Sequence, residues 1–268
     1  MKRPAKRRRA RPVRPNAGLA ALYRQRLTAL VDEMAASVEH WVSAAYRANE
    51  PRASAGMAWD DAPADALRRA IRILVRRWGR RFEEAAPRLA RWFAQSARNR
   101  SERELARILR EGGFTVRWRM TPAMRDVMQA TIGEQVGLIR TIPQQYLGEV
   151  EGMVMRSVAT GRDLASLYKE IRSRYNLTKK RAALIARDQN NKATATLLRV
   201  RQLEVGITEA IWVHSTAGKK PRPTHVANSG RVYDVAKGWF DPAIRKYIWP
   251  GTEINCRCVS RPVVKGFS

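Results

Sequence analysis

The stretch Val205-Gly-Ile-Thr-Glu-Ala-Ile-Trp-Val-His214 decides the fold, because the spacing of apolar residues changes within it. Before Gly206, apolar residues recur every three or four positions, which is typical of amphipathic helices. After Gly206, residues 210–214 take the two-residue period of a strand. The sequence therefore predicts an α+β fold, with a mostly helical N-terminal region and a small C-terminal α+β domain that contains a short antiparallel sheet.

Upstream of this stretch, glycine and proline residues separate a series of expected helices. Gly112-Gly113 should end one of them, and residues 51–63 form an expected loop. Residues 114–118 are either a short strand or an extended linker. The predicted helices cover residues 18–49, a segment from Asp61 or Asp65 to Gly79, and then about 87–110, 121–140, 143–159, 164–171 and 179–205.

The remaining strands are expected in the last forty residues, at Val232-Tyr233, at 254–258 and at 259–264. These patterns divide the chain into three parts. A disordered basic tail covers residues 1–16, a helical region covers residues 17–159, and the α+β domain covers residues 160–268.

The chain is strongly basic, with 52 Lys and Arg against 24 Asp and Glu and a net charge of +28. A folded surface does not need this imbalance, which usually indicates a polyanionic partner: first nucleic acid, and second an anionic membrane surface. No run of 18 apolar residues is present, so the sequence predicts no membrane span. The densest basic block precedes the first acidic residue, Asp32, and supplies the candidate DNA-binding residues Lys2, Arg3, Lys6, Arg7, Arg8, Arg9, Arg11 and Arg14.

This basic block should bind phosphates without sequence preference, since Arg and Lys neutralise the nucleic-acid backbone and release counterions. Mutual repulsion should keep the block disordered until a partner neutralises it. The alternative is a tail that aids solubility or contacts an acidic protein. The sixteen arginines of residues 68–119 fit a second nucleic-acid surface and a solvated helix face equally well.

Cys256 and Cys258 are the only cysteines, and a disulfide between them would be strained, so we expect the chain to be made in a reducing cytoplasm. In a strand, both thiols would face the same side. With His225, and with His214 as a fourth ligand, they could hold zinc, which prefers four such ligands in a tetrahedral array. Cysteine is also a small core residue, and packing, with His225 bracing a loop, is the favoured interpretation.

Seven short motifs follow one another over residues 155–264, and each alone is unspecific. They are Gly161-Arg-Asp-Leu164, Ile185-Ala-Arg-Asp-Gln189, Trp212, Arg222-Pro-Thr-His225, Gly230-Arg-Val-Tyr233, Pro250-Gly251 and Asn255-Cys-Arg-Cys258. In this order they resemble the phage Mu F-like family, the minor head or head morphogenesis proteins of tailed phages.

The resemblance implies a structural protein inside the phage head at the portal vertex, made in the host bacterial cytoplasm and assembled into the virion. It implies the portal protein, the major head protein and packaged double-stranded DNA as partners, with no membrane in the particle. It also implies roles in head assembly and in DNA packaging, organisation or delivery, and no established catalytic activity. The helical region would then contact the portal or a neighbouring head protein.

Two positions depart from the family pattern. Relatives often carry an acidic residue ahead of the Arg-Pro-x-His motif, where this chain has Gly218-Lys-Lys220, and a histidine before the final Pro-Gly, where it has Trp249. Both changes remove potential ligands or acid-base groups, which favours a bracing role for His225 and the cysteines. The alternative function is a metal-dependent nuclease or hydrolase centred on His225, Cys256 and Cys258, although no Gly-x-Ser-x-Gly elbow accompanies His214-Ser215.

Overall fold

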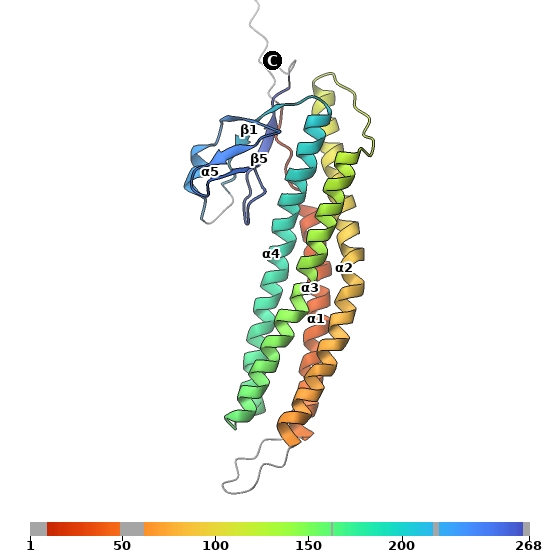
Figure 1. The fold of residues 1–268 in the computed structure, drawn as a ribbon, viewed down its shortest axis with the longest axis vertical. Helices are drawn as coiled ribbons and strands as arrows, with labels where there is room; N and C mark the ends of the chain where they lie inside the picture. Colours follow the sequence, from red (N-terminus) through yellow and green to blue (C-terminus); the bar gives the residue numbers. More distant parts are fainter. Residues whose placement is uncertain (1–9, 49–61, 162, 217–219, 265–268) are drawn as a thin grey trace, which may run out of the picture. The chain divides into compact units, whose positions relative to one another are not determined.

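A computed structural model describes residues 10–48, 62–161, 163–216 and 220–264 (Figure 1). The expected loop at 51–63 falls almost entirely outside these residues. Four long helices are followed by a short helix and five short strands, which confirms the α+β fold. The elements are α1 (Ala17–Ala48), α2 (Ala62–Glu111), α3 (Pro122–Ala159), α4 (Leu164–Glu204), β1 (Glu209–Val213), α5 (Pro223–Ala227), β2 (Val232–Asp234), β3 (Trp239–Asp241), β4 (Lys246–Ile248) and β5 (Val259–Pro262).

The chain divides into two compact units, each assembled from segments that are distant in sequence. The sheet unit comprises residues 1–21, 91–132 and 187–268, and the helical unit comprises residues 22–90 and 133–186. Each long helix has residues in both units. None of the described helices combines the length and apolarity that crossing a bilayer requires.

The helices are fewer and longer than the sequence predicted. Gly79 and Pro87 lie inside α2, Pro143 lies inside α3, and α4 continues without a break through residues 172–178. A helical proline removes one backbone hydrogen bond, but buried neighbours on both sides outweigh that loss. Ala86 and Ala90 flank Pro87 and are fully buried, as are Ile142 and Tyr146 beside Pro143.

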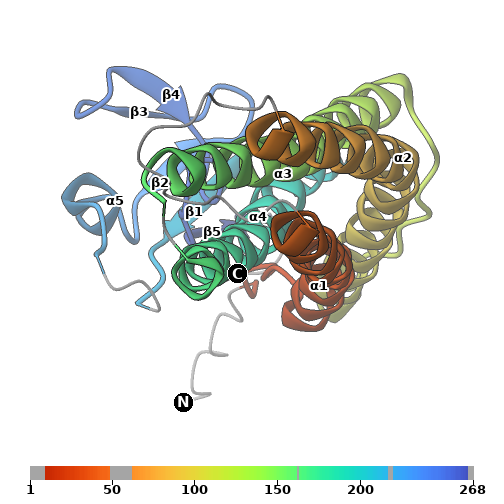
Figure 2. The ribbon, with the colours of Figure 1, turned by 90° about the horizontal axis from the view of Figure 1, so that it is seen from below.

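Side chains from all four long helices build the core of the helical unit, and Figure 2 looks along these helices. One buried polar pair joins α1 and α3 inside this core. The Tyr23 hydroxyl donates to Gln135 Oε1 at 2.7 Å, and burial raises the pKa of Tyr23. The core residues include Leu27, Val31, Met34, Leu67, Ile71, Leu74, Ile139, Val150, Ile171 and Ala182.

Two small antiparallel sheets form the C-terminal part of the sheet unit, with strand orders β2-β1-β5 and β3-β4. The change of period at Gly206 marks the entry to this part, because Gly206 takes a φ of 75° and ends the α4 segment, with Ile207 N–H bonded to the Gln202 carbonyl. The strand predicted at residues 254–258 was wrong: residues 254–255 form a turn, residues 256–258 have no regular secondary structure, and β5 begins at Val259. Residues 114–118 are an extended linker, and β3 and β4 were not predicted.

The part of the predicted tail that the structure describes is packed against this unit. Ala10 and Val13 are 5% and 2% exposed and join a core cluster with Leu105, Leu198 and Ile207. Arg11 and Arg14, between and after them, are exposed. Apolar residues thus fix the chain here while the arginines face outward, which differs from a tail disordered up to residue 16.

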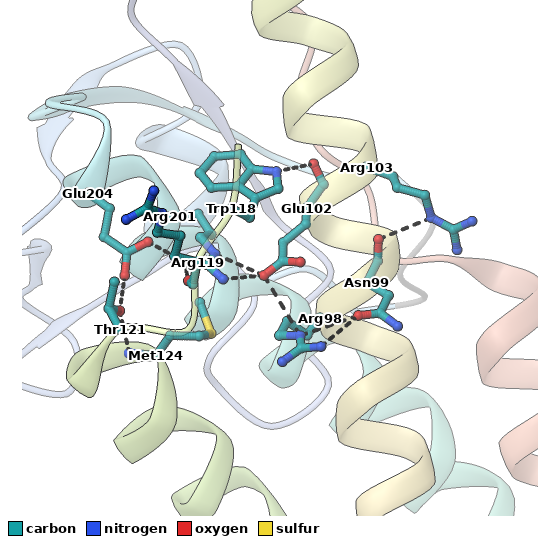
Figure 3. Close-up of polar contacts among 10 residues, drawn as sticks. All are labelled: Arg98, Asn99, Glu102, Arg103, Trp118, Arg119, Thr121, Met124, Arg201 and Glu204. Carbon is teal, nitrogen blue, oxygen red and sulfur yellow. Dashed lines mark hydrogen bonds and ion pairs between the residues drawn. The ribbon is translucent and has the colours of Figure 1, made fainter. Parts of the chain in front are cut away.

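A buried cation, Arg201, links three segments of the sheet unit (Figure 3). Its side chain is 3% exposed and forms ion pairs with Glu102 of α2 and Glu204 of α4. Its guanidinium also donates to the Arg119 carbonyl at 2.9 Å. Trp118 completes the arrangement, with its indole N–H donating to the Glu102 carbonyl at 3.0 Å. Every strong polar group around the buried charge is therefore satisfied.

Replacing Arg201 with alanine should destabilise the sheet unit by about 3–5 kcal/mol, because it leaves the partly buried Glu102 carboxylate with only the longer 3.8 Å ion pair to Arg98. Urea unfolding followed by circular dichroism measures this loss. The control is Arg81→Ala, which removes an ion pair with Glu33 between side chains that are both about half-exposed. Equal losses of stability in the two variants would show that the Arg201 network contributes no more than a half-exposed ion pair.

Candidate functional site

The two cysteines lie in residues 250–258, called the cysteine turn below, where the backbone turns sharply before β5. Gly251 takes a φ of 90°, and a Cβ there would lie 3.2 Å from the Cys258 carbonyl oxygen. Asn255 has a positive φ of 59°, and the Cys256 N–H donates to the Glu253 carbonyl at 2.9 Å. This conformation brings the thiols together without a strand, so the predicted proximity holds although the predicted strand does not.

Side chains of α4 hold this turn in place. Asp188 Oδ1 accepts the Asn255 N–H at 2.6 Å, and the Arg187 guanidinium donates to Asn255 Oδ1 at 3.1 Å. The buried Asn191 amide donates to the Cys256 carbonyl at 2.9 Å. Two of the motifs recognised in the sequence, Ile185–Gln189 and Asn255–Cys258, are thus directly bonded to each other.

His225 lies in α5, a short helix that begins with Pro223. The Arg222 guanidinium donates to the Ile254 carbonyl at 3.0 Å, which ties this helix to the cysteine turn. The His225 side chain is 2% exposed, and its Nε2 lies 3.4 Å from Oδ2 of the buried Asp241. The Thr224 hydroxyl lies 3.2 Å from the same oxygen and donates to it. The ring is therefore held in one orientation, with Nδ1 facing away from Asp241.

Aromatic rings enclose His225 on the other sides. Trp212 of β1 packs edge-to-face at a centroid distance of 5.1 Å, and Trp239 of β3 does so at 6.4 Å. Trp212 is fully buried at the centre of a core cluster that also contains Tyr233, Cys256 and Cys258. The cysteines and His225 therefore belong to a packed interior, not to an open cleft.

His214 follows β1 directly and comes close to the cysteines because of the sheet register. Val213 pairs with Val259 across the β1–β5 ladder, so the next residues outward, His214 and Cys258, face each other. The distance from His214 Nδ1 to Cys258 Sγ is 3.6 Å, and His214 is half-buried. Sequence position alone could not supply this pairing.

His225, Cys256 and Cys258 form a compact cluster whose ligand atoms all lie within 4.8 Å of one another. His225 Nδ1 lies 3.5 Å from Cys256 Sγ and 3.8 Å from Cys258 Sγ. The hydrogen bond from Cys258 lowers the pKa of the Cys256 thiol, while the same contact and burial raise the pKa of Cys258. The three residues predicted as metal ligands are thus brought together by the fold.

A basic groove of about 750 Å³ lies elsewhere on the sheet unit. It is lined by Arg11 and Arg14 from the N-terminal segment and by Arg100, Arg103 and Arg107 from α2, with Glu104 between them. Glu104 and Glu111 pair with Arg107, whereas the other four arginines form no ion pair with the acidic residues that the structure describes. The predicted DNA-binding residues Lys2, Arg3, Lys6, Arg7, Arg8 and Arg9 lie outside the described residues.

Three contributors to these sites were missed in the sequence. Asp241 and Asn191 carry no local motif, and only the fold places them beside His225 and Cys256. Trp249, which replaces a histidine of the family pattern, donates its indole N–H to the Val235 carbonyl at 2.9 Å and stacks with Arg199 at 4.0 Å. Trp249 therefore contributes to packing. The cluster of His225, Cys256 and Cys258 forms without a histidine at position 249.

Residues 148–261 match the family described as Phage Mu protein F like protein. The chain is also 33% identical over 146 residues to an uncharacterized protein of Haemophilus influenzae, which covers 54% of this chain and 31% of that protein. The chain thus spans about a third of the length of the curated relative that it matches. No solved structure matches it. The chain therefore contains a phage Mu F-like domain over residues 148–261, which confirms the resemblance seen in its motifs.

Replacing Asn191 with alanine should expose the cysteine turn, because it removes a buried amide that donates to the Cys256 carbonyl. We expect a loss of about 1–3 kcal/mol in stability and faster alkylation of both thiols by iodoacetamide, measured by mass spectrometry on the native chain. Asn99→Ala, on an exposed part of α2, is the control. Identical alkylation rates in both variants would contradict the bracing role.

Proposed function

We propose that this chain is a minor head protein of a tailed phage that acts in head morphogenesis and contacts packaged DNA without sequence preference. The phage Mu F-like domain over residues 148–261 supports the class of protein. The basic groove on the sheet unit supports the contact with DNA and is the observation that carries this part of the proposal.

The groove suits a phosphate backbone for two reasons. Arg11, Arg14, Arg100 and Arg103 present guanidinium groups that can each make paired hydrogen bonds to phosphate oxygens. Asn16, at the groove, accepts a hydrogen bond from Arg100 at 3.1 Å, which orients that side chain. In the sequence, the basic residues 2–9 directly precede the segment that lines the groove, and we propose that they add further phosphate contacts.

The same proposal assigns the chain to the inside of the virion head at the portal vertex, with the portal protein, the major head protein and double-stranded DNA as partners. A structural role suits the cysteine cluster as well. His225, Cys256 and Cys258 are each at most 4% exposed, so a substrate would have little access to them. This burial favours the head protein over the competing nuclease or hydrolase.

Replacing Arg11, Arg14 and Arg103 with serine should weaken binding to random-sequence duplex DNA. Each lost phosphate contact reduces the slope of log K against log salt by about 0.9, so the triple variant should lose up to about three units of slope. Fluorescence anisotropy over a series of KCl concentrations measures both the affinity and the slope.

The matched control removes the same charge from the helical unit, through Arg69→Ser, Arg72→Ser and Arg76→Ser on the exposed face of α2. If this control weakens binding as much as the groove variant, net charge alone explains the affinity and the groove is not the binding site. An unchanged slope in the groove variant would remove the assignment altogether.

Electron microscopy of intact phage particles tests the assignment to the head. We expect density for the four long helices beside the portal ring inside the capsid. Density on the outer shell or the tail would contradict the proposal, as would complete absence from purified particles by mass spectrometry.

A further inference from the structure

We propose that His214, His225, Cys256 and Cys258 form a structural zinc site inside the sheet unit. This inference does not depend on the contact with DNA. It rests on the close spacing of the His225, Cys256 and Cys258 ligand atoms, on the contact between His214 and Cys258, on the carboxylate behind His225 and on the backbone that fixes the cysteine turn.

The distances between ligand atoms match a tetrahedral zinc centre. With Zn–S near 2.3 Å and Zn–N near 2.0–2.1 Å, a tetrahedral angle places nitrogen and sulfur ligands about 3.6 Å apart. His225 Nδ1 lies 3.5 Å from Cys256 Sγ and 3.8 Å from Cys258 Sγ, and His214 Nδ1 lies 3.6 Å from Cys258 Sγ. Cys256 and Cys258 also satisfy the 4.8 Å limit, so one ion can reach both thiolates at once.

His214 is the fourth ligand because the β1–β5 ladder holds it opposite Cys258. His214 is half-buried and directly follows β1. Two sulfur and two nitrogen ligands in tetrahedral order favour zinc over the hard cations that prefer oxygen. Four protein ligands leave no open coordination position, which distinguishes a structural site from a catalytic one.

Asp241 acts as a positioning residue for this site. Metal-binding histidines commonly donate their second ring N–H to a carboxylate, which fixes the tautomer and makes the ligand nitrogen more basic. Asp241 Oδ2 lies 3.4 Å from His225 Nε2, and Asp241 is fully buried. Its other oxygen accepts the Ala243 N–H at 3.0 Å, so the carboxylate is itself held in place.

The small size of the local core gives the ion a physical role. The sheets here contain three and two strands, and no strand exceeds five residues in the described chain. Zinc would connect three segments that are otherwise joined by short ladders: the end of β1, helix α5 and the cysteine turn. Binding free energy from such an ion adds directly to the stability of the folded state.

Elemental analysis of the full chain, purified without added metal or chelator, should give one zinc per chain. Removing the zinc and adding Co²⁺ should produce the intense near-ultraviolet bands of thiolate-to-cobalt charge transfer and the visible bands of tetrahedral cobalt. Cys258→Ser should lose the zinc and the charge-transfer intensity of one thiolate. His40→Ala, which changes an exposed histidine on α1, is the matched control and should keep one zinc.

Asp241→Asn keeps all four proposed ligands, so it tests the site even if Cys258→Ser fails to fold. We expect it to retain the tetrahedral cobalt spectrum while zinc affinity falls by about 10–100-fold, measured by competition with a chromophoric chelator. The proposal is overturned if the folded wild-type chain contains no zinc and Co²⁺ gives no charge-transfer bands. Zinc that persists in Cys258→Ser overturns it equally.

Discussion

The buried guanidinium of Arg201 is the constraint on which the sheet unit depends. A cation removed from water is tolerated only when strong partners surround it, and Glu102, Glu204 and the Arg119 carbonyl supply them. These partners come from α2, from α4 and from the linker before α3, so three segments must meet for the charge to be satisfied. Since β1 begins five residues after Glu204, the position of the whole ladder follows from this contact.

Local backbone chemistry was readable from the sequence, while long-range packing was not. Gly113 and Gly206 end helices because both take positive φ angles, and the Thr121-Pro122 pair starts α3, with Thr121 accepting the Met124 N–H. Pro87 and Pro143 suggested further helix ends, but buried neighbours keep both inside continuous helices. Segments as short as β3 and β4 carry too few residues for a period to appear.

In the candidate zinc site, too, local features could be predicted from the sequence and long-range packing could not. Residue type and spacing were enough to single out His225, Cys256 and Cys258, and His214 was considered as a fourth ligand. At Trp249 and Gly218-Lys-Lys220 the sequence departs from the family pattern and lacks possible metal ligands, which favoured packing over metal binding. The register of β1 with β5 and the placement of Asp241 supply what the sequence could not show: His214 opposite Cys258 and a carboxylate behind His225.

Segments that are distant in sequence share one core in the sheet unit, which affects when this unit can fold during synthesis. Ala10 and Val13 share a core with Leu198 and Ile207, so the earliest and latest parts of this unit are separated by nearly two hundred residues. While the chain leaves the ribosome, the first segment finds its earliest core partners in Leu105, Ile108 and Leu109 of α2, and the cluster is complete only when Leu198 and Ile207 emerge. During that interval its arginines stay open to any polyanion nearby, including the ribosomal RNA itself.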